Sequence, residues 1–162
     1  MMEPYLVLKW LHIISSTLLF GTGLGTAFHG WMSMRSGNPQ ALAVIGRSVV
    51  LADWIFTTPA VIVQPITGIL LVQHLGHAWN EAWLLLSLGL YLFVGACWLP
   101  VVWLQIQLRR MAETALRQGT ELPGQYYRMA RIWFVLGWPA FIGVLIIFWL
   151  MIARPNFAAY WP

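Results

Sequence analysis

Long apolar stretches separated by short polar segments dominate the pattern along this chain. The stretches cover about residues 5–32, 44–74, 82–108 and 132–153. Each exceeds the roughly 20 apolar residues that a helix needs to cross the hydrocarbon core of a bilayer. Residues 36–39, 76–81 and 119–124, rich in glycine, proline and polar side chains, interrupt them. The pattern therefore predicts an all-α fold, a bundle of four transmembrane helices in a single domain over residues 1–162.

Composition supports the bilayer as the solvent. The chain has 162 residues, of which 60% are hydrophobic and only 9% are charged, whereas soluble domains carry about 25% charged residues. Tryptophan favours the interfaces of a membrane, and several of the eleven tryptophans fall at the predicted span ends: Trp31, Trp79, Trp83, Trp133 and Trp161. The net charge of +4 comes from residues that flank the apolar stretches. We therefore expect a lipid bilayer as partner and no nucleic acid.

The arginines predict the orientation. The loop after the first stretch is flanked by Arg35 and Arg47, and the loop after the second has no lysine or arginine. The segment after the third stretch holds five arginines: Arg109, Arg110, Arg117, Arg128 and Arg131. Basic loops stay in the cytoplasm. We expect a multi-pass protein of the bacterial inner membrane with both termini on the periplasmic side.

Ionisable groups inside membrane spans are costly and are candidates for function. Lys9 and His12 share one face of the first predicted helix, at spacing i, i+3. The first two predicted helices are antiparallel, so residues equally far from the loop that joins them lie at the same depth. His12 is then level with Thr67, and Gln64 lies about one helical turn away. Two interpretations follow. His12 is either a ligand of a metal or haem iron, or a structural residue that hydrogen-bonds Gln64 or a backbone carbonyl freed by Pro65.

The same counting brings Asp53 within about one turn of His29. The carboxylate would then orient the imidazole, form a structural pair with it, or pair with Arg47 instead.

His74 and His77 end the second stretch at spacing i, i+3, with Glu81 nearby. Two imidazoles and a carboxylate are a candidate metal site, although interfacial histidines often have no such role.

Gly21 and Gly25 allow either close helix packing or a flat ligand against the first helix. Cys97, the only cysteine, forms no disulfide within the chain. Pro59, Pro65 and Pro100 predict bends in the second and third helices.

Residues 9–14 read Lys-Trp-Leu-His-Ile-Ile and resemble the opening of the first helix in HemJ-type protoporphyrinogen oxidases and in CopD-type copper-resistance proteins. Residues 58–60 and 68–71 resemble the Thr-Pro-Ala and Gly-Leu segments of the second helix, and Trp83 the tryptophan that opens the third. Overall, the chain resembles a bacterial family of predicted integral membrane proteins, domain of unknown function 2269. The resemblance covers about the first two thirds of the chain.

By this resemblance, His12 matches the first-helix histidine associated with haem b. The Leu-Pro-Arg segment of HemJ-type proteins late in the first helix has no counterpart here, nor does a lysine near the start of the third. The resemblance thus implies tetrapyrrole binding rather than the oxidase reaction.

Three functions stay open from the sequence. The first is a haem-binding redox protein that exchanges electrons with a membrane quinone or another redox partner, with Lys9, His12, Gly21, Gly25 and Gln64 around the cofactor. The second is transport of copper, another metal or a small solute through His12, His74 and His77. The third is a non-catalytic subunit of a membrane complex, or a homo-oligomer. The sequence shows no nucleophile–base pair, phosphate-binding loop or paired carboxylate that would assign a reaction.

Overall fold

The computed structural model describes residues 4–156 and is helical nearly throughout. Its elements, in chain order, are α1 (Pro4–Ser36), α2 (Pro39–Ala52), η1 (Asp53–Thr57), α3 (Thr58–Leu75), α4 (Ala82–Gln118) and α5 (Gly124–Ala153). The segment η1 is a single π-helical turn, and α2, η1 and α3 follow one another without a break. The described residues thus form four long helices and no strand, which confirms the predicted all-α class. Trp161 lies outside the described residues.

Capping residues in the sequence mark where several helices begin and end. The Asn38 side chain accepts a hydrogen bond of 2.9 Å from the Gln40 backbone N–H and so caps the start of α2. Gly76 and Gly119 end α3 and α4 in the left-handed conformation, with φ of 68° and 62°. Glycine adopts this conformation at little cost because it has no Cβ.

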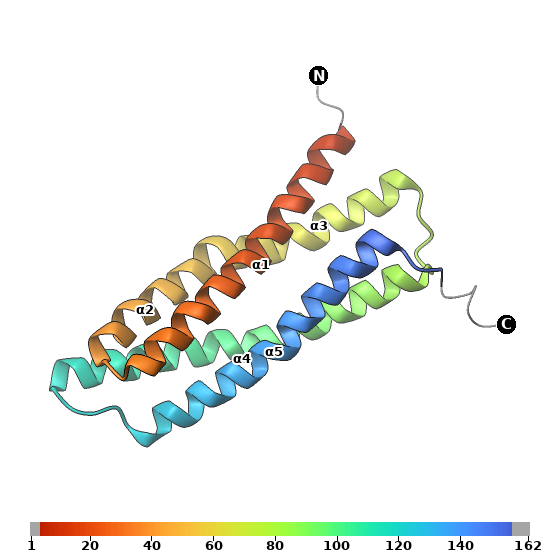
Figure 1. Ribbon diagram of the computed structural model, residues 1–162. Helices are drawn as coiled ribbons and strands as arrows, with labels where there is room; N and C mark the ends of the chain where they lie inside the picture. Colours follow the sequence, from red (N-terminus) through yellow and green to blue (C-terminus); the bar gives the residue numbers. More distant parts are fainter. Residues whose placement is uncertain (1–3, 157–162) are drawn as a thin grey trace.

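The four long helices run up and down in an antiparallel bundle (Figure 1). The beginning of α1, the α3–α4 turn and the end of α5 lie at one end, and the α1–α2 and α4–α5 loops lie at the other. Both basic loops predicted from the sequence are therefore at the same end. Helix α4 continues to Gln118 and α5 begins at Gly124, so most of the basic segment after the third apolar stretch is helical.

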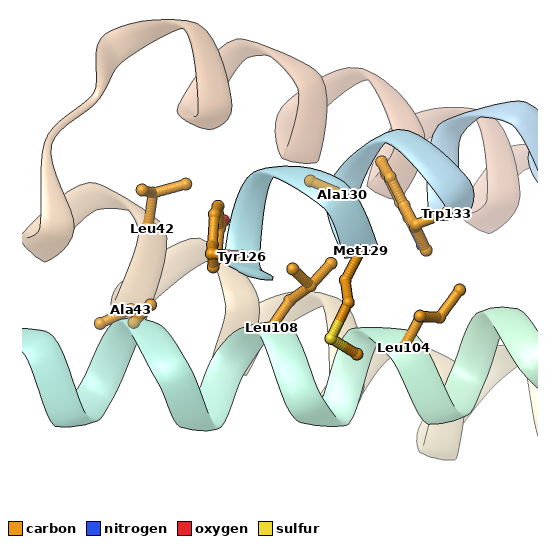
Figure 2. Close-up of a cluster of buried hydrophobic side chains, with 9 residues drawn as sticks. Leu42, Ala43, Leu104, Leu108, Tyr126, Met129, Ala130 and Trp133 are labelled. Atoms are coloured by element: carbon orange, nitrogen blue, oxygen red, sulfur yellow. The ribbon is translucent and has the colours of Figure 1, made fainter. Parts of the chain in front are cut away.

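Two small apolar clusters hold the ends of the bundle together. The larger lies near the basic loops and joins α2, α4 and α5 (Figure 2). It consists of Leu42, Ala43, Leu104, Leu108, Ala112, Tyr126, Met129, Ala130 and Trp133. The smaller joins α3, α4 and α5 at the opposite end, through Val72, Trp83, Leu84 and Leu150.

Large apolar side chains cover the outside of the bundle. Leu92 and Leu99 are each 65% exposed and Ile152 is 84% exposed. All four long helices are long and apolar enough to cross a membrane. In water such a surface would be strongly unfavourable, whereas hydrocarbon chains solvate it well. The bundle is therefore built to lie in lipid.

Candidate functional site

His12 lies at the centre of a closed network of hydrogen bonds, here called the histidine cluster, which comprises His12, Ser15, Gln64 and Thr67. Nδ1 of His12 is 2.9 Å from Oγ1 of Thr67, and Nε2 is 3.2 Å from Nε2 of Gln64. Oγ of Ser15 donates to Oε1 of Gln64. These contacts confirm that His12 is level with Thr67 and adjacent to Gln64.

The partners of Thr67 fix the protonation of the ring. The Thr67 hydroxyl donates to the backbone carbonyls of Val63, at 2.8 Å, and Gln64, at 3.1 Å. Its proton is thus engaged, so Nδ1–H of His12 donates to it. Nε2 then accepts from the Gln64 amide. The network thus gives a hydrogen-bond partner to both nitrogens of a neutral imidazole.

Gly68 allows this cluster to form. A Cβ atom on Gly68 would lie 3.2 Å from Cε1 of His12, so a larger residue would push the imidazole away from α3. The position of His12 is therefore specified by the sequence of α3 as well as by α1, and the cluster fastens the two helices together.

A second polar group, the aspartate cluster, comprises Asp53, Thr57 and Gln105. Asp53 and Gln105 are only 5% and 7% exposed. Oδ1 of Asp53 accepts a hydrogen bond of 2.9 Å from the Thr57 hydroxyl. Oδ2 of Asp53 and Oε1 of Gln105 have no hydrogen-bond partner, although both are buried. Unlike the histidine cluster, this group leaves strong acceptors unsatisfied.

The π-helical turn η1 places the aspartate cluster. Pro59 follows it, and a proline ring inside a helix clashes with the carbonyl of the fourth residue before it, here Ile55. The wider π turn relieves such a clash, and π turns are frequent at functional sites. The sequence predicts a bend at this point, but not its π form.

A cavity of about 340 Å³ lies beside the aspartate cluster. This volume is within the range of about 300–1,000 Å³ that is typical of sites for small molecules. Side chains of α1, η1, α3, α4 and α5 line it, with Asp53, Thr57, Gln64, Tyr91 and Gln105 among the polar ones. Its aromatic residues are Phe20, Tyr91, Trp98, Trp133, Phe134, Trp138, Phe141 and Phe148.

The wall of the cavity is thus mainly apolar and rich in aromatic side chains, with a few polar groups. Gly23, Gly95 and Gly137 also line it, and a Cβ on any of them would meet nothing within 4 Å. These glycines leave open space instead of admitting a neighbouring helix.

The other histidines have separate partners. His77 is 3.1 Å from Oε1 of Glu81 through Nδ1, and 3.2 Å from Nη1 of Arg154 through Nε2. His74 instead stacks on Tyr5, with ring centroids 5.7 Å apart. Within residues 4–156, no three His, Cys, Asp or Glu side chains are grouped closely enough to hold a metal ion.

The polar side chains at this end of the bundle instead tie the α3–α4 turn to the end of α5. The Trp83 indole donates to Glu81 at 2.5 Å, and the Arg154 guanidinium lies over the Trp83 ring at 5.6 Å. The hydrogen bond from the Trp83 indole and those from His77 and the Ala78 backbone N–H hold the pKa of Glu81 below its ordinary value.

The predicted pairing of Asp53 with His29 is not formed. His29 is exposed on the outside of α1 and packs edge-on against Phe28, whereas Asp53 is buried against Thr57. The alternative partner Arg47 binds Glu113 at 2.6 Å. Counting along the helices gives depth but not rotation about the axis, and these predictions depended on rotation.

Lys9, Gly21 and Gly25 do not line the cavity. Lys9 is exposed and lies over the Tyr5 ring at 5.6 Å. A Cβ on either glycine would meet nothing within 4 Å, so no neighbouring helix requires a glycine at these positions.

The glycines that admit a neighbour closely are others. A Cβ on Gly30 would lie 2.9 Å from the Trp133 ring, and one on Gly143 would lie 2.7 Å from Val94. Nothing in their sequence context distinguishes them from Gly21 and Gly25.

Four long apolar helices with a lipid-compatible outer surface define a polytopic α-helical integral membrane protein. The chain matches the family described as predicted integral membrane protein, domain of unknown function 2269, over residues 6–155. It belongs to that family. No curated protein matches the chain, and no solved structure matches it.

Proposed function

We propose that this protein binds a flat, membrane-soluble ring compound of the quinone class in the cavity beside the aspartate cluster. The single observation that carries the proposal is the cavity itself, a space of about 340 Å³ whose wall is rich in aromatic side chains and includes a few polar groups. Quinones carry electrons and protons in bacterial membranes, so the proposal keeps the redox role expected from the sequence. The protein lies in the inner membrane with both termini in the periplasm.

The walls suit such a ligand chemically. Aromatic side chains stack on a planar ring in offset or edge-to-face geometry, and the cavity offers them from α1, α4 and α5. The wall also includes hydrogen-bonding groups that can fix the orientation of a ring, among them Asp53 and Gln105. A mostly apolar pocket with a few convergent polar groups is the usual form of a small-molecule site.

Iron-ligated haem fits the described residues less well. Haem iron is held by histidine, cysteine, methionine or tyrosine. Among residues 4–156, the cavity wall includes no histidine, cysteine or methionine, and its only tyrosine, Tyr91, donates its hydroxyl to the Val61 carbonyl at 2.6 Å. His12, the ligand expected from the resemblance, is bonded through both ring nitrogens.

Equilibrium dialysis tests the proposal. The purified protein in detergent is dialysed against duroquinone, and the bound fraction is compared between wild type and two glycine variants. Gly95→Leu places a side chain in the cavity, whereas Gly89→Leu places one where nothing lies within 4 Å and outside the cavity wall. We expect saturable binding to wild type and Gly89→Leu, and at least a tenfold weaker affinity in Gly95→Leu.

Non-saturable uptake by all three proteins would reject the proposal, because it would reflect partition into the detergent. Equal saturable binding to all three would also reject it, since the ligand would then lie elsewhere.

The orientation has a separate test. A periplasm-active phosphatase fused after Pro162 should be active, and one fused at Gly119 should be inactive. The reverse result would place the arginine-rich loops outside and overturn the topology.

A further inference from the structure

We infer that the ligand of the cavity carries a hydroxyl group on its ring, as a quinol or phenol does, and that Asp53 and Gln105 together accept its hydrogen bond. This inference rests on the proposed function and names the chemical form that the same site prefers. It assigns the aspartate cluster as the determinant of specificity.

The first argument is the set of unsatisfied atoms. Oδ2 of Asp53 and Oε1 of Gln105 are buried acceptors without partners. A buried polar atom without a hydrogen bond is costly, most of all where hydrocarbon replaces water. The two residues line the same cavity, and Gln105 is close enough to Asp53 to interact with its carboxyl. One donor placed between them would satisfy both.

The second argument is that the hydroxyl groups of the cavity wall already donate to protein acceptors. The Thr57 hydroxyl donates to Oδ1 of Asp53, and the Tyr91 hydroxyl donates to the Val61 carbonyl. The Ser16 hydroxyl donates to the Ile13 carbonyl, and the Thr26 hydroxyl donates to the Thr22 carbonyl. The hydroxyl groups of the cavity wall thus have acceptors of their own. The Trp133 indole N–H, which also lines the cavity, is a buried donor without a partner. A hydroxyl both donates and accepts hydrogen bonds, so a ligand hydroxyl is expected to supply the donor for Asp53 and Gln105.

The third argument concerns the form of the ring. The oxidised form of a quinone carries carbonyl oxygens, which only accept hydrogen bonds and would face two more acceptors. The reduced form carries hydroxyls, which donate. A site built to bond a hydroxyl disfavours the analogue that lacks it, because its own polar groups are then left unpaired. The aspartate cluster should therefore favour the hydroxylated form.

A matched pair of ligands tests the inference. The compounds 1-naphthol and 1-methoxynaphthalene share one ring, but only the first has a hydroxyl donor. Dissociation constants are measured by equilibrium dialysis for wild type, Asp53→Leu, Gln105→Leu and a control, Ser16→Ala. Ser16 lines the same cavity, and its hydroxyl already has an acceptor. Because the preference is compared between proteins, unequal partition of the two compounds into detergent cancels.

We expect wild type and Ser16→Ala to prefer 1-naphthol by about tenfold more than either leucine variant does. The inference is overturned if wild type and the two leucine variants show the same preference. In that case saturable binding of both compounds leaves the proposed function standing. If neither compound binds saturably to wild type, the proposed function fails and the inference fails with it. Either leucine variant alone decides the comparison, so loss of folding in one does not prevent the test.

Discussion

The histidine cluster and the aspartate cluster both bury polar side chains in the same bundle, but they differ in whether the polar atoms have hydrogen-bond partners. In the first, both nitrogens of His12 and the side chains of Gln64 and Thr67 bond one another. In the second, Oδ2 of Asp53 and Oε1 of Gln105 have no partners and lie beside an open cavity. A saturated network holds helices together, whereas an unsaturated one next to free space is suited to a ligand.

This difference changes how a histidine inside a membrane span is interpreted. A polar residue in hydrocarbon is a candidate for function by default, and His12 is the most prominent example in this sequence. Its neighbours nevertheless satisfy it completely. The aspartate cluster draws less attention in the sequence, yet its unsatisfied acceptors make it the better candidate.

The largest expected change in stability comes from a substitution that disrupts the histidine cluster. His12→Ala removes the two hydrogen bonds that the imidazole makes to Thr67 and to the Gln64 amide across α1 and α3. It should lower the free energy of unfolding by about 2–3 kcal/mol. His29→Ala, at an exposed position on the same helix, should change it by less than about 0.5 kcal/mol. Thermal unfolding in detergent, followed by circular dichroism, measures both. Equal melting temperatures for wild type and His12→Ala would show that the cluster does not hold the helices.

Asp53→Asn should not lower the free energy of unfolding, in contrast to His12→Ala. The new amide donates to Oε1 of Gln105, which has no partner in wild type, while its oxygen still accepts from Thr57. We expect the free energy of unfolding to stay the same or to rise by about 1 kcal/mol. The same unfolding assay applies. A loss as large as that of His12→Ala would make Asp53 a structural residue and would remove the contrast between the two clusters.

A pair of glycines sharpens the contrast further. Gly68→Ala places a Cβ 3.2 Å from Cε1 of His12, whereas Gly95→Ala places one in the open cavity. The first should lose about 1 kcal/mol of stability through crowding. The second should gain about 0.5–1 kcal/mol, because alanine favours the helix more than glycine does. Changes of the same sign in both variants would argue against the difference in packing.

The smallest expected change in stability concerns Glu81, which lies outside both polar clusters and provides a comparison with them. Its folded-state pKa is below the ordinary value of 4.5, chiefly through the Trp83 indole. The stability that it contributes is therefore fully present above about pH 4.5 and is lost as the pH falls through the folded pKa. Melting temperatures of wild type and Glu81→Gln should differ at neutral pH and converge in acid. A constant difference across this range would exclude the Glu81 carboxylate as the cause.

Much of the fold could be predicted from the sequence, because four apolar stretches with breakers between them specify long antiparallel helices. Depth in the bundle was also predictable, and it placed His12 beside Thr67 and Gln64. Rotation about each helix was not. The π turn that begins at Asp53 was not predictable either. His29 lies exposed on the outside of α1, whereas Asp53 is buried. The cavity depends on the rotation and spacing of several helices together, so no local pattern indicates it.

The most direct measurement is the position of a bound ring compound, mapped with a photoreactive azidoquinone in the detergent-purified protein. Labelled residues are identified by mass spectrometry, with and without excess duroquinone as competitor. We predict competed labels within residues 16–27, 91–105 and 133–148, which line the cavity, and their loss in Gly137→Leu. Competed labels at residues 9–12 and 67–77 would instead place the ligand at the histidines and contradict the assignment of the cavity as the binding site.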